Sequence, residues 1–317
     1  MKFKKKIKVC FIGLNNHSKI IRNIALKSGI ISEWFIYLHR KGTKEEKNIT
    51  NNLKDILDTD AIFILSPDHL HISFLEYIKN LDYKGYVFCE KPPVINKKNI
   101  NYLKKLDYKK FFFNFNERFG RIFSNLQEIK NKKVIGDILN VYTETGHGLA
   151  FKSKFKNSWR PKKLKKNLMI LTKSIHHIDM FNLLFSNLKK VSHLPTEYKQ
   201  KNIYGSSCAN FISNKTIFTF FSSYYSPYIN LIRIIGTNGY LEILKNKIKI
   251  YYPRNFFDKE KRFTHPPLKK VINLNNNCYK DSLNKSVNYF LDCCIQKKGF
   301  KRTFLENSIS TMELILN

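Results

Sequence analysis

The first third of the chain alternates short apolar runs with segments of helical spacing. The apolar runs at 7–14, 61–67 and 85–93 are nearly continuous, which is typical of strands covered on both faces. Between the first two, residues 18–29 have helical spacing and stop at Gly29. The same pattern predicts further strands at 33–40 and 109–119 and helices at 51–58, 70–80 and 98–106. Strand, helix, strand at this spacing predicts right-handed crossovers and a parallel sheet.

From about residue 117 the pattern changes. Helices are predicted at 118–130, 167–185, 281–296 and 304–315, and alternating strands at 202–212, 215–225 and 229–252. Consecutive strands with turn signals such as "TNG" favour an antiparallel sheet. We therefore expect an α/β protein with an N-terminal doubly wound parallel sheet of Rossmann type at 1–117 and a C-terminal α+β domain at 118–317. The second domain has a mostly antiparallel open sheet, and its last helix can pack back on the first domain.

Composition limits the class of protein. Hydrophobic residues make up 43% of the 317 residues, which is enough for two cores. No apolar run approaches the roughly 18 to 20 residues needed to cross a bilayer, so we expect no membrane partner. The six cysteines are scattered and have no metal-ligand spacing. Free thiols in a reducing cytoplasm and no metal site are the predictions from this pattern.

The formal net charge of +33 raises the question of nucleic acid. The lysines are spread along the whole chain and accompany an excess of Asn and Ile, as expected from an A/T-rich genome. The aromatic residues lie in strand-like runs rather than among basic residues. We predict nonspecific attraction to polyanions in low salt and no specific nucleic-acid partner. The open sheet of the second domain makes a homo-oligomer through that sheet plausible.

Four short stretches carry candidate chemistry: "GLNNHS" (13–18), "SPDHLH" (66–71), "CEKPP" (89–93) and "SIHHID" (174–179). With "NERF", "IGDI", "SWR" and "IIGTNGYLEI", their order and spacing resemble the Gfo/Idh/MocA oxidoreductases, the family of glucose–fructose oxidoreductase and inositol 2-dehydrogenase. The resemblance covers nearly the whole chain. It implies NAD(P)-dependent transfer of a hydride between nicotinamide and a hydroxyl or carbonyl carbon of a sugar or sugar derivative. Surface-polysaccharide or nucleotide-sugar biosynthesis is a role that the family often has.

The resemblance assigns two catalytic residues. Lys91 follows Glu90 at the end of a parallel strand, where an ammonium can stabilise negative charge on a reacting oxygen and also contact the cofactor. His176 matches the family's acid–base histidine, and we expect both side chains to face one nicotinamide ring. Thr172 stands where the family commonly has an aspartate that orients the histidine, and it cannot supply a charge. The alternative for Lys91 is an ordinary surface lysine. The alternative for His176 is a histidine that only packs at the domain interface.

The first loop departs from the G-x-G-x-x-G pattern. Gly13 is present, but Asn15 and Ser18 occupy the second and third glycine positions. Asn15 tolerates a left-handed conformation and has an amide that could donate to a phosphate, and Ser18 is a good N-cap. We predict cofactor contacts from Gly13, Asn15, Asn16 and His17, aided by the N–H groups of the helix start.

The end of the second strand favours NADP(H) over NAD(H). It carries His39, Arg40 and Lys41 instead of an acidic residue, and an arginine such as Arg40 binds a 2′-phosphate that a carboxylate would repel.

The resemblance also implies further binding residues. Ser66 and Pro67 would line the cofactor side, and His71 would either contact the cofactor or fix the loop by bonding to neighbouring backbone. The residues implied for the sugar pocket are Asn116, Arg118, Trp159, Arg160, Thr172 and Asp179. The runner-up function is a catalytically degenerate member that binds nucleotide or sugar without turnover, because Asn15, Ser18 and Thr172 all depart from the pattern.

Overall fold

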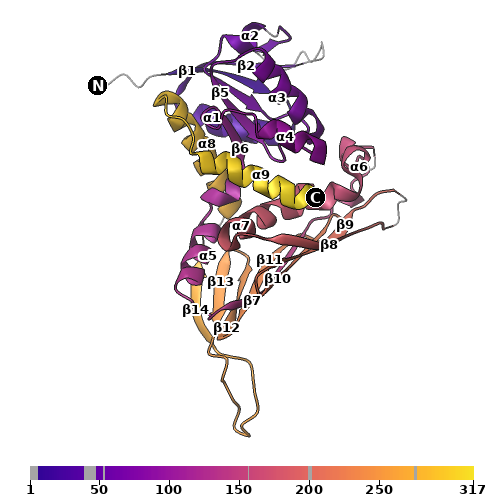
Figure 1. Ribbon diagram of the computed structural model, residues 1–317, viewed down its shortest axis with the longest axis vertical. Coiled ribbons are helices and arrows are strands. Elements are labelled where there is room, and N and C mark those ends of the chain that lie inside the picture. Colours follow the sequence, from indigo (N-terminus) through magenta and orange to yellow (C-terminus); the bar gives the residue numbers. More distant parts are fainter. Residues whose placement is uncertain (1–5, 39–47, 53, 156, 199–201, 275–276) are drawn as a thin grey trace. The chain divides into compact units, whose positions relative to one another are not determined.

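The computed structural model describes residues 6–38, 48–52, 54–155, 157–198, 202–274 and 277–317. The chain divides into two units (Figure 1). Unit 1 contains Met1–Asn116 and Leu283–Leu316, and unit 2 contains Glu117–Ser282 together with Asn317. One boundary falls within helix α8 (Cys278–Ile295). Among the described residues, no helix is long and apolar enough to span a bilayer.

Unit 1 is built on a six-stranded sheet in the order β3-β2-β1-β4-β5-β6, in which every pair of neighbours is parallel. The strands are β1 (Ile7–Ile12), β2 (Ile31–Tyr37), β3 (Ile49–Thr50), β4 (Ala61–Ile64), β5 (Tyr86–Glu90) and β6 (Phe111–Asn114). This is the strand order of the doubly wound dinucleotide-binding fold. The predicted parallel sheet is confirmed, and the short β3 is a strand that the sequence pattern did not reveal.

A row of phenylalanines crosses the parallel sheet and fixes its register. Phe11, Phe63, Phe88 and Phe112 are register partners on successive strands, with ring centroids 5.0, 4.8 and 5.7 Å apart along the row. Phe290 of α8 packs edge-on against the second and third rings at 5.0 and 5.3 Å. The C-terminal part of the chain therefore completes the core of unit 1. Its helices are α1 (Asn16–Lys27), α2 (Lys54–Leu57), α3 (His71–Asn80), α4 (Ile100–Leu103) and α9 (Arg302–Leu316), with the unit 1 part of α8.

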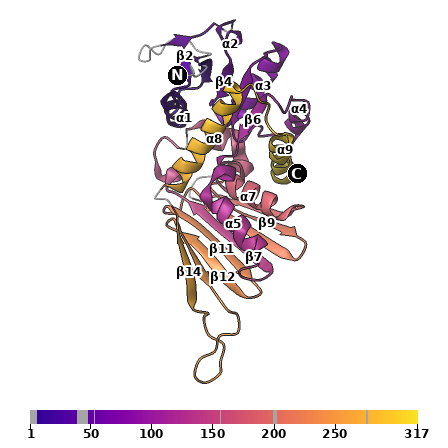
Figure 2. The ribbon, with the colours of Figure 1, turned by 90° about the vertical axis from the view of Figure 1, so that its left-hand side faces the viewer.

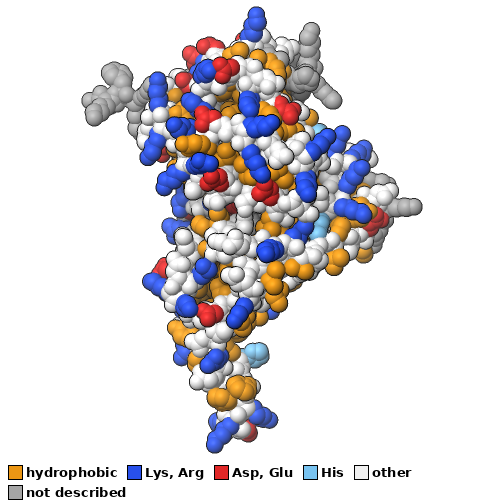
Figure 3. Space-filling model, viewed as in Figure 1, with side chains coloured by type: hydrophobic (Ala, Val, Ile, Leu, Met, Phe, Trp, Pro, Cys, Tyr) orange, Lys and Arg blue, Asp and Glu red, His pale blue; other side chains and the backbone are white. Residues whose placement is uncertain are grey.

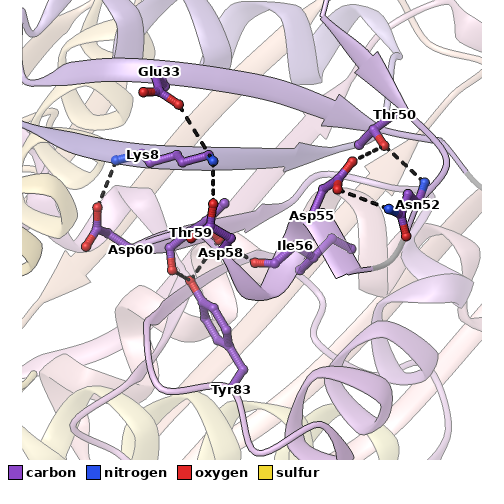
Figure 4. Close-up of polar contacts among 10 residues, drawn as sticks. All are labelled: Lys8, Glu33, Thr50, Asn52, Asp55, Ile56, Asp58, Thr59, Asp60 and Tyr83. Carbon is purple, nitrogen blue, oxygen red and sulfur yellow. Dashed lines mark hydrogen bonds and ion pairs between the residues drawn. The ribbon is translucent and has the colours of Figure 1, made fainter.

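Polar contacts tie the start of β4 to β1 at the amino edge of the sheet (Figure 4). The backbone N–H of Lys8 donates to Asp60 at 2.9 Å, and its ammonium donates to Asp58 at 2.7 Å. The hydroxyl of Tyr83 donates to the carbonyl of Thr59 at 2.9 Å. Pairing with Asp58 raises the pKa of Lys8. These contacts fasten the segment before β4 to β1 at the amino edge. Doubly wound folds bind their ligands at the opposite, carboxyl edge of the sheet.

Unit 2 contains an eight-stranded sheet in the order β14-β13-β12-β11-β7-β10-β9-β8. Its strands are β7 (Ile138–Gly146), β8 (Lys189–Thr196), β9 (Ser206–Ser213), β10 (Thr216–Ser223), β11 (Ile229–Gly236), β12 (Gly239–Leu244), β13 (Lys247–Tyr251) and β14 (Leu268–Asn273). Within the described residues β7 and β10 are parallel neighbours and the other pairs are antiparallel. The predicted mostly antiparallel sheet is confirmed.

Helices cover one face of this sheet (Figure 2). They are α5 (Arg121–Asn131) and α7 (Ile175–Phe185), and unit 2 also contains the short helix α6 (Trp159–Leu164). Phe185 of α7 packs edge-on against Phe218 of β10 at 4.9 Å, and Phe181 lies 6.1 Å from Phe220. Along β10 the alternate residues Phe218 and Phe220 are buried, whereas Ile217 on the other face is 53% exposed. The alternation of the strands thus gives one covered and one open face.

Candidate functional site

The turn after β1 is held against the end of β4 by Gly13 and Asn15. Gly13 has a φ of +124°, and a Cβ at this position would lie 2.6 Å from the carbonyl oxygen of Leu65. Asn15 caps α1, because its side-chain oxygen accepts the N–H of Ser18 at 2.9 Å. Its amide nitrogen donates to the same Leu65 oxygen at 2.9 Å. The turn is therefore well ordered without the second and third glycines.

This geometry changes the expected role of Asn15. Its backbone is extended, with φ −72° and ψ 168°, so it does not use the left-handed conformation expected for it. Both ends of its amide already have partners within the protein, so a bond from this amide to a phosphate would break the cap or the link to β4. The backbone N–H groups of Asn16 and His17 in the first turn of α1 remain the natural donors for an anion.

Glu90 is the centre of a buried polar cluster at the carboxyl edge of the parallel sheet. Its side chain is 8% exposed, and Oε1 accepts the amide N–H of Asn114 at 2.6 Å and lies 3.4 Å from Nε2 of His17. Oε2 accepts the backbone N–H of Lys91 at 3.2 Å. Burial alone would raise the pKa of Glu90, but His17, Asn114 and the Lys91 ammonium together lower it. The cluster thus holds an ionised carboxylate beside the first turn of α1.

Two buried polar atoms at the same edge of the sheet have no hydrogen-bond partner among the described residues. They are the hydroxyl oxygen of Ser66, just after β4, and the side-chain oxygen of Asn114 at the end of β6. The orientation of the Asn114 amide is fixed, because a carboxylate only accepts and Glu90 must therefore face the amide nitrogen. A group that offers hydrogen-bonding atoms, such as the carboxamide and ribose of a nicotinamide nucleotide, fits these unused positions.

His71 links the loops after β4 and β5. Its Nδ1 lies 2.8 Å from the carbonyl oxygen of Pro92, its Nε2 lies 2.8 Å from that of Ser66, and the side chain is fully buried. This is the geometry of the loop-fixing alternative. Pro67 follows Ser66 and precedes α3, and it is half-buried. Lys91 directly follows β5 and is also half-buried.

The predicted long helix of unit 2 is not uniform. Residues Ile170–Ser174 form a π-helical turn, η6, and α7 begins only at Ile175. Thr172 lies in this turn and donates its hydroxyl to the carbonyl of Leu168 at 2.6 Å. His176 is half-buried in the first turn of α7. Thr172 therefore lies in a π-helical turn, and His176, four residues later, lies just after that turn. Such turns are often found at functional sites.

Arg118 and Asp179 form a buried, two-pronged ion pair within unit 2. The two guanidinium nitrogens donate to the carboxylate at 2.8 and 2.6 Å, and the side chains are only 6% and 1% exposed. The pair joins the segment before α5 to α7. Asn116, at the end of unit 1, is buried as well. The structure therefore gives Arg118 and Asp179 a joint structural role that the sequence alone did not indicate.

Several cations lie near the end of β7 in unit 2. Burial, followed by the charges of Lys173, Lys152 and Arg160, lowers the pKa of His147 to about 4. The guanidinium of Arg160 stacks over the ring of Trp159, 4.9 Å from its centroid. The residues predicted for a sugar pocket in α6 thus present an aromatic face already covered by a cation.

Some expectations stay predictions. His39, Arg40 and Lys41 lie outside the described residues, so the preferred nicotinamide nucleotide is a prediction from sequence. Lys91 belongs to unit 1 and His176 to unit 2, and their convergence on one ring stays a prediction as well. Asn114 is a site residue that the sequence analysis missed. Its signal was its position at the end of a buried strand, like that of Glu90.

Solved structures share this fold over nearly the whole chain. An apo scyllo-inositol dehydrogenase from Lactobacillus casei matches with a TM-score of 0.72 at 20% identity, covering 99% of this chain and 95% of that chain. A levoglucosan dehydrogenase in complex with NADH and levoglucosan gives 0.77 at 13% identity, covering 98% and 95%. A 3-ketoreductase from Actinomadura kijaniata in complex with TDP-benzene and NADP gives 0.74 at 14% identity, covering 98% and 96%.

Sequence comparisons add nothing to this likeness. No protein-family model matches the chain, and a search of curated proteins gives no significant match. The fold that the motifs led us to expect is thus confirmed.

Proposed function

We propose that the chain is an NAD(P)-dependent oxidoreductase of the Gfo/Idh/MocA type that acts on a sugar or sugar derivative. Support comes from the fold shared with sugar dehydrogenases and from the order of the motifs. The observation that carries the proposal is the Glu90 cluster. It places an ionised carboxylate, Lys91 and two unpartnered buried oxygens at the edge of the sheet where doubly wound folds bind nucleotides.

The bound nicotinamide would exchange a hydride with the carbon that bears the reacting oxygen. In the direction of oxidation, His176 accepts the hydroxyl proton as the carbon loses its hydride, and in reduction it returns that proton to the carbonyl oxygen. Lys91 donates a hydrogen bond to the same oxygen and stabilises its negative charge. The N–H groups of Asn16 and His17 in the first turn of α1 would bind the diphosphate of the nucleotide.

We infer the substrate class from α6 and α7. The Arg160 guanidinium stacks on one face of the Trp159 ring, so a sugar ring would pack against the other face. Arg160 supplies donors for hydroxyl or acidic groups. The substrate is a keto- or hydroxy-sugar, and the proposed setting is nucleotide-sugar or surface-polysaccharide biosynthesis.

A single-turnover experiment tests the redox function. Purified protein is mixed with NADPH and a panel of keto-sugars, and loss of nicotinamide absorbance is followed. Lys91→Met and His176→Asn should each reduce the rate by about 10²–10⁴-fold while nucleotide binding persists. Binding of NADPH with no oxidation by any sugar would sink the enzyme assignment.

The cofactor preference needs its own measurement, because Arg40 has no described position. NADPH should bind more tightly than NADH, and Arg40→Ala should shrink the difference. Equal affinities of the unaltered protein for the two nucleotides would remove the argument.

A second candidate is a nucleotide- or sugar-binding protein without turnover. The observation that favours it is Thr172, whose hydroxyl bonds to Leu168 within the helix in place of a carboxylate that could stabilise a charged histidine. Thr172→Asp separates the two candidates. An active enzyme should gain rate from it, whereas a protein without turnover should stay silent.

We also propose self-association through the open face of the unit 2 sheet. Ile217 and Ile235 on this face are 53% and 41% exposed, and Arg233 and Glu242 pair beside them at 2.6 Å. Sedimentation of Ile217→Lys against the unaltered chain tests it, since a buried lysine would disfavour the dimer. A monomer at all concentrations in both proteins would contradict this proposal.

A further inference from the structure

The connection between β13 and β14 projects from one end of the unit 2 sheet (Figures 1 and 2). It is an ordered hairpin. The N–H of Asp258 donates to the carbonyl of Arg262 at 3.0 Å, and that of Thr264 donates to Phe256 at 3.1 Å. Phe257 and Phe263 form an antiparallel bridge between its two sides. We call residues 254–265 the tip hairpin.

The tip hairpin exposes three phenylalanines. Phe263 is 79% exposed, Phe257 46% and Phe256 39%. The rings of Phe257 and Phe263 pack against each other with centroids 4.8 Å apart, so they form one small apolar surface. Figure 3 shows hydrophobic side chains together with basic ones at this lower end of the view. Phenylalanine side chains have no polar atom that interacts favourably with water. A hydrogen-bonded hairpin that exposes three of them therefore indicates a binding surface.

The charges of the tip hairpin are arranged so that its acids are neutralised. Arg262 binds Asp258 at 3.1 Å and Glu260 at 2.9 Å. Arg254, Lys259 and Lys261 form no ion pair with any described residue. Four cations and two acids therefore leave an excess of positive charge around the phenylalanines: Arg254, Lys259, Lys261 and Arg262 against Asp258 and Glu260.

We propose that the tip hairpin docks the protein on the surface of an anionic lipid bilayer. The phenylalanines enter the boundary between headgroups and acyl chains, and Lys259 and Lys261 lie at the level of the lipid phosphates. Apolar insertion combined with attraction to anionic lipids is the physical basis of peripheral membrane binding. This contact needs no membrane-spanning segment. It departs from the sequence-based expectation that the chain has no membrane partner, and it is independent of the redox function.

Charge and shape favour lipid over other occupants. A second copy would bring the same local excess of positive charge to a tip-to-tip contact, so two tip hairpins repel each other. A single strand of nucleic acid needs a basic groove with aromatic faces open for stacking. The tip hairpin is a projection, and Phe257 and Phe263 already pack on one another. A bilayer surface accepts a projecting tip and has the opposite charge.

Vesicle binding by the full chain tests the apolar part. The probes are vesicles of phosphatidylcholine alone and of phosphatidylcholine with phosphatidylglycerol, at about 0.15 M salt so that distant charges are screened. We expect sedimentation with the anionic vesicles, weakened about tenfold in the double variant Phe257→Ser and Phe263→Ser. Tyr228→Ser is the matched control, because Tyr228 is 81% exposed outside the hairpin. It should bind like the unaltered chain.

A second pair of variants tests the charges. Replacing Lys259 and Lys261 by Gln should weaken binding to anionic vesicles by about fivefold per lysine. Lys247→Gln with Lys249→Gln removes the same charge from the exposed face of β13 and should have little effect. Thermal unfolding of each variant checks that the exposed substitutions leave the fold intact.

Three results would overturn the proposal. Equal loss from both lysine pairs, with no effect of the phenylalanines, would indicate adhesion by the overall net charge alone. Binding of a single-stranded oligonucleotide that depends on Phe257 and Phe263 would indicate nucleic acid instead. If the fluorescence of the Phe263→Trp variant does not shift to the blue on vesicles, the tip stays in water.

Discussion

The two ends of the Asn114 side-chain amide have different environments at the carboxyl edge of the sheet. Its amide nitrogen binds the buried carboxylate of Glu90, and its oxygen remains for another donor. We predict that Asn114→Leu lowers the free energy of unfolding by about 1.5–3 kcal/mol, because a buried carboxylate loses a hydrogen bond. The same substitution should weaken the binding of a nicotinamide nucleotide. Urea unfolding and nucleotide titration measure the two effects.

Asn114→Asp is the matched test of charge at this position. It preserves size but places a second carboxylate against Glu90, so its stability should improve as the pH falls and one of the two is protonated. A Leu variant as stable as the unaltered protein would show that the bond contributes nothing.

Single residues were predictable where the chain itself carries the pattern. The catalytic role of Lys91 stays a prediction, but the position of the Glu90–Lys91 pair at the end of a strand was predicted from the sequence. Its partner Asn114 was not, because it is brought to Glu90 only by the parallel register of β5 and β6, in which the two residues are partners. The sequence favoured Ser18 as the N-cap of α1, but the structure has Asn15 in that position, because the Asn15 side-chain oxygen accepts the N–H of Ser18. The second bond of the Asn15 amide depends on where β4 ends.

At the scale of elements, the turn between β1 and α1 depends on Gly13. Gly13→Ala combines a positive φ with a Cβ 2.6 Å from the Leu65 carbonyl oxygen. We predict a loss of about 3 kcal/mol in unfolding free energy and loss of nucleotide binding as the turn moves. Gly29→Ala is the control, since Gly29 also has a positive φ, +69°, but nothing lies near its added Cβ. A nucleotide affinity equal in the two variants would contradict the argument.

The ion pair between Arg118 and Asp179 joins α7 to the segment before α5. Asp179→Asn should cost about 3–5 kcal/mol, because it leaves a guanidinium buried without its counterion. The double variant Arg118→Met and Asp179→Leu should be more stable than either single variant, since no buried charge remains. Urea unfolding of the three proteins measures this coupling. Additive losses would show that the two side chains act independently.

Elements were predictable where periodicity is long and regular. The strands β1, β2, β4, β5 and β6 follow from apolar runs, β9 to β13 follow from alternation, and α1 follows from its spacing. The pattern did not reveal β7, β8 and β14 of unit 2. The pattern did not reveal β3, because two residues carry no periodicity. Nor did it show that the helix expected at 167–185 contains a π turn, because a single added residue hardly disturbs helical spacing.

At the scale of the molecule, the aromatic row of unit 1 shows why the fold was predictable and its completion was not. The strands β1, β4, β5 and β6 each contribute a phenylalanine from their own apolar run, so this part of the parallel sheet is encoded locally. The covering ring, Phe290, comes from the far end of the chain and depends on tertiary packing. Positions that depend on long-range contacts carry no local signal.

Unit 2 should lose stability in acid because of His177. This side chain is 7% exposed, and burial, with a smaller effect of Lys173, lowers its pKa to about 4. In the unfolded chain the pKa is about 6.5, so the unfolded state binds more protons between these values. Stability is therefore full above about pH 6.5 and falls by about 3 kcal/mol as the pH drops through 4. His147 and His193 have the same direction but are less buried.

The two tryptophans allow this loss to be assigned to unit 2. Trp34 lies in unit 1 and Trp159 in unit 2, so a Trp34→Phe background leaves fluorescence that reports on unit 2 alone. In that background His177→Gln should flatten the dependence of the unfolding free energy on pH, even if the variant is less stable at neutral pH. The slope is the informative quantity, because a structural loss lowers the curve at every pH, whereas removal of a titrating group changes its shape. Parallel curves for the two proteins would show that protonation of His177 does not govern the acid sensitivity of this unit.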